Sequence, residues 1–359
     1  MLANLLPLAL YQLSGILGVG IFALPYLFYH SNIYFSLFGL VLASFITYKV
    51  NTSYIKVITT IKTTNQLSGY AQKILGPASR HVVALNMFAL SLGAILVLVQ
   101  MSGKFINILF PLPYASSFFV LILFFLYLAK LKLLDFLLRY LPIFFILIPA
   151  ILYFASTNQP SLPLPVQSPS FAFFGWTMFA LSGFTVLPEL WTKTKSFANS
   201  VQLLKQASLF GLLLAVAIYT IFIIAILKLS GQNVSQDVVY GLVNHHPFLS
   251  SLVAIFGLIS VTKASLNFLE IIFDVTHFDL KLQSATSKII ACFIPLFSLL
   301  LLEFNFDKPI KLLATFSVFT SIAIIFLLRI KLGKTPFYKK IIMLFCILVF
   351  LAATIAELQ

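Results

Sequence analysis

The sequence predicts an all-α, polytopic membrane protein, and three observations lead to this class. Of 359 residues, 61% are hydrophobic and only 9% are charged, whereas soluble domains carry about 25% charged residues. The apolar residues stand in long unbroken runs, which excludes the short alternating strands of a transmembrane barrel. The net charge of +14 does not indicate a nucleic-acid partner, because lysines gather in the cytoplasmic loops of membrane proteins and no basic cluster is interleaved with aromatic residues.

Eleven segments are apolar over about the 20 residues that a bilayer span requires. In chain order they are 5–29, 33–55, 82–108, 112–129, 138–155, 171–190, 207–229, 248–273, 286–302, 309–328 and 338–356. The spans at 112–129 and 286–302 are short, so we expect them to be tilted or partly interfacial.

The lysines and arginines alternate with these spans. Eighteen of the 23 lie in loops on one side, four lie on the other side, and Lys263 lies within a span. Because cytoplasmic loops hold the excess of basic residues, this distribution predicts a cytoplasmic N-terminus and an extracellular C-terminus. We expect a multi-pass protein of the cell membrane, either an inner or a plasma membrane.

Two segments outside the spans organise the chain. Residues 56–80 contain QLSGYAQKIL before Gly-Pro, which predicts a short helix at the cytoplasmic membrane face. Residues 156–170 hold four prolines and no charge, which predicts a stiff extracellular connector at the midpoint of the first ten spans. We therefore expect one transporter domain over 1–359, with a first repeat at 1–155, a second inverted repeat at 171–329 and an extra C-terminal span in 330–359.

The first and sixth spans carry matching helix breakers. The first reads SGILGVGIFALP over residues 14–25, and the sixth reads LSGFTVLPEL over 181–190. Each has Ser-Gly near its centre and then Leu-Pro, and the two spans cross the membrane in opposite directions. Either segment alone favours close helix packing. Together, at corresponding positions of two halves, they indicate broken helices and a transporter binding site.

A broken helix frees backbone groups, and these need a partner inside the membrane. Glycine permits the break and lets a ligand approach the backbone. The freed amides suit a carboxylate, whereas the freed carbonyls suit an ammonium group or a metal cation. An amino acid, which is a zwitterion, needs both kinds of group.

The motifs also resemble a known group. SGILGVGIFALPYLF is similar to the first-span signature of the amino acid/auxin permease group, and most similar to that of bacterial hydroxy/aromatic amino acid permeases. FALSGFTVLPEL, ASLNFLEIIFDVTHFDLK and FIPLFSLLLL followed by KPIKLLATFS resemble its sixth, eighth and ninth spans. The resemblance implies a LeuT-type fold of the amino acid-polyamine-organocation superfamily, with a 5+5 inverted repeat, broken spans 1 and 6, and an eleventh span. It further implies import of aromatic or bulky neutral amino acids by alternating access.

The resemblance also places the substrate between the two breaks. Residues expected to meet its carboxylate and ammonium groups are Ser14, Gly15, Gly18 and Gly20. Residues expected to line its side-chain pocket are Phe179, Ser182, Gly183 and Phe184.

The eighth predicted span carries charges where the resemblance implies small or apolar residues. Lys263 lies near the middle of this span, and Glu270 follows seven residues later on the same face. A central lysine costs about 2.5–3.5 kcal/mol on insertion scales, so it needs an internal partner or a wet cavity. In sodium-coupled members of this fold, spans one and eight form a sodium site, to which Thr262 and Ser265 would supply hydroxyls. Since the Lys263 ammonium would repel sodium, we expect proton-coupled symport. Sodium-coupled transport, an uncoupled carrier or exchanger, and a structural ion pair for Lys263 remain open.

Other classes of function are less consistent with the sequence. A membrane enzyme would need paired acids or a histidine cluster, and only nine acidic residues are present. A channel or a receptor on the same scaffold remains open, whereas a primary pump would need a nucleotide-binding loop. Cys292 and Cys346 lie in apolar runs and predict neither a disulfide nor a metal site. We expect a monomer without a cofactor, whose partners are an amino acid substrate, H⁺ or Na⁺, and the lipid bilayer.

Overall fold

The described part of the chain is built from helices, and no strand occurs in it. The computed structural model describes residues 2–63, 65–129, 132–159, 171–243, 246–303, 307–333 and 336–357. The α-helices are α1 (Leu2–Ile16), α2 (Gly20–Tyr29), α3 (Ile33–Ile61), α4 (Leu67–Leu75), α5 (Pro77–Leu109), α6 (Ala115–Ala129), α7 (Lys132–Ala155), α8 (Phe171–Leu181), α9 (Leu187–Thr194), α10 (Ser200–Ser230), α11 (Val239–Val243), α12 (Pro247–Asp274), α13 (Ser284–Glu303), α14 (Asp307–Lys331) and α15 (Phe337–Glu357). Two 3₁₀ turns, η1 (Phe184–Val186) and η2 (Gly231–Asn233), and one π-helical turn, η3 (Val275–Asp279), complete the set.

The chain is a multi-pass helical membrane protein. Within the described residues, α3, α5, α10, α12 and α13 are each long and apolar enough to cross a bilayer, and so is the pair α1–α2 taken together. The pair is bent by 65° at its break. The eleventh span and the inverted repeat remain predictions. Most of the proline-rich connector, residues 160–170, lies outside the described residues.

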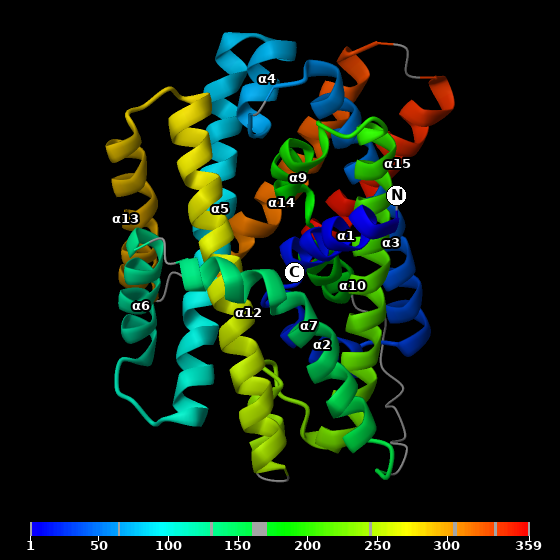
Figure 1. The fold of residues 1–359 in the computed structure, drawn as a ribbon. Coiled ribbons are helices and arrows are strands. Elements are labelled where there is room, and N and C mark those ends of the chain that lie inside the picture. The colour runs from blue at the N-terminus through cyan, green and yellow to red at the C-terminus, as the bar shows by residue number, and fades with distance from the viewer. Residues whose placement is uncertain are drawn as a thin grey trace.

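Two groups of helices face each other across the molecule (Figure 1). One group is centred on α5, which packs against α12, α13, α14 and α6. The other is centred on α10, which packs against α1, α2 and α3, while α8 packs against α2 and α3. Both interrupted helices therefore belong to the second group and border the first.

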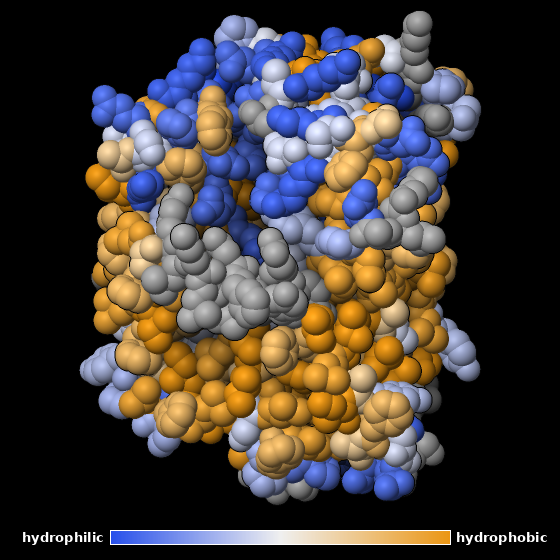
Figure 2. Space-filling model, in the orientation of Figure 1, coloured by the Kyte–Doolittle hydropathy of each residue, from blue (hydrophilic) through white to orange (hydrophobic). Residues whose placement is uncertain are grey.

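The surface matches a protein embedded in a bilayer. Figure 2 shows an apolar belt between two hydrophilic ends, and the end that holds α4 and α9 is the more extensively hydrophilic. At that end the hydrophilic surface continues into a hollow beside α12. We call it the basic end, because it holds the basic residues of the loops and short helices there and of the first turn of α5: Lys62, Lys73, Arg80, Lys193 and Lys195.

Helix α4 packs against α5, α14 and the η3 turn that follows α12, rather than lying exposed on the membrane face. Its residues Leu67 to Ala71 are buried, and the Asp279 carboxylate accepts four hydrogen bonds from its N-terminal turn and the residues before it. The turn that leads into α4 begins at Lys62, whose left-handed conformation (φ 58°) ends α3. The amphipathic pattern predicted the helix but not its burial, since the partner lies more than 200 residues away.

Phenylalanines close the core on the side away from the basic end. The Phe22 ring lies 5.0 Å from that of Phe105, 5.7 Å from Phe222 and 5.5 Å from Phe256, and Phe145 lies 5.6 Å from Phe256. All five side chains are fully buried. Tilted and edge-on aromatic contacts of this kind stabilise a core beyond their buried area, so the cluster forms a tight seal next to α2.

Candidate functional site

The first break leaves backbone groups available at the centre of the molecule. The last helical hydrogen bond of α1 runs from Leu17 N to Leu13 O at 2.8 Å. Within the described chain, neither the amides of Gly18 and Val19 nor the carbonyls of Ser14 and Gly15 are paired. Because unpaired buried backbone groups are costly, this arrangement is that of a site that a ligand or water completes.

Close packing explains two of the three glycines at this break. A Cβ atom on Gly15 would lie 2.6 Å from Val186 Cγ2, and one on Gly20 would lie 2.5 Å from Ala180 Cβ. A Cβ atom on Gly18 would meet only Ala264, at an ordinary 3.5 Å. Gly15 and Gly20 therefore let the two interrupted helices touch, whereas Gly18 leaves space.

The second break lies directly opposite the first and is held to it by side chains. After α8 ends at Leu181, Ser182 turns back so that its amide and its hydroxyl both donate to Phe179 O, at 3.1 and 2.6 Å. Gln12 Nε2 donates to Gly183 O at 3.0 Å. The Tyr219 hydroxyl lies 2.8 Å from Ala180 O and 3.3 Å from Ile16 O, so it joins the ends of α8 and α1. Neither Gln12 nor Tyr219 was expected from the sequence.

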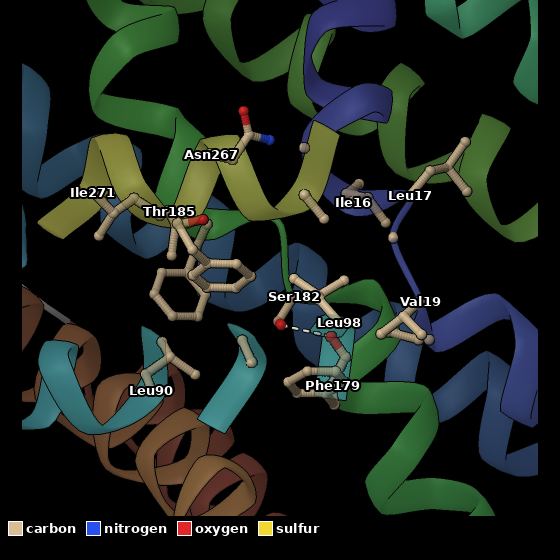
Figure 3. A pocket seen from close by; sticks show the side chains of 18 of the residues that line it. Ile16, Leu17, Val19, Leu90, Leu98, Phe179, Ser182, Thr185, Asn267 and Ile271 are labelled. Carbon is tan, nitrogen blue, oxygen red and sulfur yellow. Dashed lines mark hydrogen bonds between the residues drawn. The ribbon is translucent and has the colours of Figure 1, made fainter. Parts of the chain in front are cut away.

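A cavity of about 60 Å³ lies between the breaks, α5 and α12. Figure 3 shows Asn267 and Thr185 on the side of the cavity where Ile271 lies, and Ser182 and Phe179 on the side of Val19. The lining consists of Ser14, Gly15, Ile16, Leu17, Gly18, Val19, Gly20, Leu90, Ala94, Leu98, Phe179, Ala180, Ser182, Phe184, Thr185, Ala264, Asn267, Phe268 and Ile271. The space accommodates a few water molecules or a small solute, so a bulky aromatic substrate would need the site to widen.

Seven of the eight residues expected to contact substrate line this one cavity: Ser14, Gly15, Gly18, Gly20, Phe179, Ser182 and Phe184. The eighth, Gly183, does not line it. A side chain at Gly183 would collide with Ile16, so this glycine serves the contact between the two breaks.

The four residues expected to couple an ion do not line the cavity. The Thr262 hydroxyl donates to Leu258 O within its own helix, at 2.7 Å. Ser265 is buried, and its hydroxyl has no partner in the described chain. Glu270 borders a separate small cavity with Tyr127 and Lys288. Only Lys263 reaches the main cavity indirectly, because its Nζ donates to Asn267 Oδ1 at 2.8 Å.

Asn267 and Thr185 are the polar lining residues that the sequence analysis missed. Asn267 lies one helical turn after Lys263 on α12, and Thr185 lies in η1. Both side chains are half-buried. The 3.6-residue period that follows Lys263 along its helix points to Asn267, whereas no pattern in the sequence distinguishes Thr185.

The fold and the cavity together define a helical membrane protein with two opposed, interrupted spans around a central site. Solved structures of similar fold include those of a manganese transporter from Eremococcus coleocola. One structure of a single-residue mutant of that transporter matches with a TM-score of 0.69 and 13% sequence identity, over 97% of this chain and 84% of that chain. The complex with an aromatic bis-isothiourea compound matches with a TM-score of 0.69 and 14% identity, over 98% and 85%. No protein-family model matches the sequence, and no curated protein matches it significantly.

These findings correct the family assignment made from the motifs. The structures that share the fold are named as manganese transporters, not as amino acid/auxin permeases, although the LeuT-type fold itself is common to both. The named proteins are transporters and not enzymes, as the sequence analysis expected. The family assignment was wrong because Gly-x-Gly and Leu-Pro indicate only a broken membrane helix. Different families can share such a break, since its backbone geometry requires the same residue types.

The cavity of this chain offers backbone and amide carbonyls to a cation but no acidic or imidazole side chain. Its lining has no carboxylate, imidazole, thiol or thioether group, whereas Mn²⁺ favours carboxylate, carbonyl and water oxygens. Among the described residues, no group of three or more His, Cys, Asp or Glu side chains could hold a metal ion.

Proposed function

We propose that this protein is a secondary transporter that carries a small neutral amino acid across the cell membrane by alternating access. The observation that carries the proposal is that unpaired amides and unpaired carbonyls occur together at the first break. They border a cavity lined by hydroxyl and amide groups but by no acidic side chain. Amides suit a carboxylate and carbonyls suit an ammonium group, so a zwitterion fits both. The small cavity volume favours a small substrate over an aromatic one.

Alternating access follows from the two groups of helices. The interrupted helices belong to the group around α10, and the rest of the cavity wall comes from α5 and α12. A rocking motion of one group against the other would open the site alternately to the two sides. The two-repeat organisation, 1–155 and 171–329 with an extra span in 330–359, is part of this proposal, as are the cytoplasmic N-terminus and the extracellular C-terminus.

Proton coupling is the favoured form of energy supply. Lys263 precedes Ala264, the residue nearest to Gly18 of the first break, and its Nζ donates to Asn267 Oδ1 of the cavity lining. A fixed cation there opposes an inorganic cation at the same place. Uptake should then persist when choline replaces sodium and should stop with a protonophore, whereas a strict sodium requirement would contradict this part of the proposal.

The decisive experiment is uptake into proteoliposomes that contain the purified full-length chain. We expect saturable uptake and counterflow of a labelled small amino acid such as alanine, less uptake of tryptophan, and no uptake of Mn²⁺ above that of empty liposomes. Saturable Mn²⁺ uptake without amino acid uptake would overturn the proposal. Flux that neither saturates nor shows counterflow would favour a channel instead.

A further inference from the structure

The last carbonyl groups of both interrupted helices meet at the breaks without a partner in their own helix. Helix α1 ends at Ile16 and helix α8 ends at Leu181, and the last four carbonyls of any α-helix lack the amide of a following turn. A carbonyl that stays unpaired in a buried position costs free energy comparable to a lost hydrogen bond. Each helix end therefore needs a donor from elsewhere, either a ligand or another side chain.

A single hydroxyl on a third helix serves both ends. Tyr219 lies on α10, and its side chain is fully buried. Its hydroxyl oxygen lies 2.8 Å from Ala180 O, in the last turn of α8, and 3.3 Å from Ile16 O, at the end of α1. A hydroxyl carries one proton, so Tyr219 donates chiefly to the nearer carbonyl and shares this proton with the farther one. The two helix ends therefore converge on one donor.

A second donor joins the same two breaks. Gln12 lies one helical turn before Ile16 on α1 and is fully buried, and its Nε2 donates to Gly183 O at 3.0 Å. Gly211 of α10 makes room for this side chain, because a Cβ atom on Gly211 would lie 2.7 Å from Gln12 Cβ. Two side chains, from α1 and α10, thus hold carbonyl groups at both breaks.

The backbone groups that a ligand would meet follow these bonded carbonyls closely. Gly18 and Val19 come two and three residues after Ile16, and Ser182 comes two residues after Ala180. All of them line the cavity. Since each peptide group is planar, fixing one carbonyl restricts the directions of the peptide groups that follow it. A site that is held in its binding geometry before the ligand arrives has less ordering cost to meet on binding.

We propose that Tyr219 is a positioning residue, whose hydroxyl holds the two breaks in one geometry, and that Gln12 is a second tether between them. This inference rests on the proposed function, because it assigns the geometry of the substrate site to a residue that does not line the cavity. Tyr219 thereby sets the affinity for the substrate without touching it.

The first test measures uptake of labelled alanine into proteoliposomes by Tyr219→Phe, which removes the hydroxyl and keeps the ring. We expect the KM for alanine to rise about tenfold, as for one lost hydrogen bond, while the maximal rate changes less than about twofold. Tyr70→Phe is the matched control, because Tyr70 is equally buried and its hydroxyl donates to Thr63 O at 2.7 Å, before α4 rather than at a break. This control should keep the KM of the wild type. An unchanged KM in Tyr219→Phe, or an equal rise in Tyr70→Phe, would overturn the positioning role.

The second test needs no substrate, so it separates this inference from the proposed function. Hydrogen–deuterium exchange is measured on peptides covering 12–20 and 178–186, which hold the paired amides of Leu17 and Ser182. Tyr219→Phe should raise exchange in both peptides about tenfold, whereas Tyr70→Phe should raise it only in peptides covering 65–75. Gln12→Met, which keeps the length of the side chain but removes the donor, should also raise exchange in 178–186.

The outcomes distinguish the two proposals. In Tyr219→Phe, unchanged exchange at both breaks, or a change at only one of them, would show that the hydroxyl does not hold the breaks together. Faster exchange at both breaks, with no amino acid uptake by the wild type, would support the tether and contradict the proposed function.

Discussion

Replacing Asp279 with asparagine should release helix α4 from the end of α12. Asp279 Oδ1 lies 3.0 Å from Asn65 Nδ2 and 3.3 Å from Gln66 N. Its Oδ2 lies 2.6 Å from Ser68 Oγ and 2.9 Å from Gly69 N. Only 1% of the Asp279 surface is exposed, so water cannot replace a hydrogen-bond partner that its carboxylate loses.

The size of the effect follows from the count of acceptors. Asparagine keeps one oxygen and turns the other into a donor, which removes two of the four hydrogen bonds. Hydrogen bonds to a charged group contribute about 1.5–3 kcal/mol each, so the local anchoring should weaken by about 3–6 kcal/mol. Local opening of α4 should then become about 10²- to 10⁴-fold more frequent, since 1.4 kcal/mol corresponds to a factor of ten.

Hydrogen–deuterium exchange read by mass spectrometry on peptides covering 65–75 measures this opening directly. Asp274→Asn is the matched control, because Asp274 lies at the same end of α12. Its carboxylate accepts one hydrogen bond from Gln66 Nε2, at 3.0 Å, just before α4. An asparagine oxygen can keep this bond. We expect less than about a tenfold change for this control. Equal exchange in the two variants, or an Asp279→Asn chain that exchanges like the wild type, would refute the anchoring role.

Three further predictions concern stability. Phe22→Ala should destabilise the protein by about 3–5 kcal/mol, because it empties the centre of the buried aromatic cluster, and the melting temperature in detergent should fall most for this variant. Lys104→Met should cost about 1–3 kcal/mol, because its partner Asp237, 3.0 Å away, is only 8% exposed but keeps hydrogen bonds from Ser235 and Tyr240; a larger fall in melting temperature than for Phe22→Ala would contradict the ranking. Gly20→Ala should lower the melting temperature more than Gly18→Ala, because only the first Cβ atom meets a backbone within 3 Å, and equal melting temperatures would show that the break is loosely packed.

The sequence predicted the interruptions because they depend on local chemistry. Glycine and proline weaken a helix wherever they stand, and the structure places breaks at residues 17–19 and 182–183, inside the segments that carried them. The positions of Gly15 and Gly20 against Val186 and Ala180 depend instead on the approach of two helices about 165 residues apart, which no local pattern encodes.

The residues expected to couple an ion remain a prediction, and the structure places them away from the cavity lining. Thr262 and Ser265 lie on the helix that the sequence identified, but the face turned to the cavity carries Ala264, Asn267 and Ile271. A hydroxyl on a helix can return its hydrogen bond to its own backbone, as Thr262 does. Which face of α12 turns inward is decided by its packing on α5, and a uniformly apolar sequence does not reveal that rotation.

Substrate selectivity depends on the side chains around the break rather than on the fold. This chain and the manganese transporters share a fold, and a broken helix exposes both amides and carbonyls whatever the substrate. Side chains around the break then select among anions, cations and zwitterions. In this chain no acidic side chain lines the cavity, so it lacks the carboxylates that a divalent-cation site favours. A negative charge added near the break, as in Asn267→Asp, should therefore weaken binding of a substrate carboxylate more than Asn267→Ala does, although aspartate is the closer match in shape.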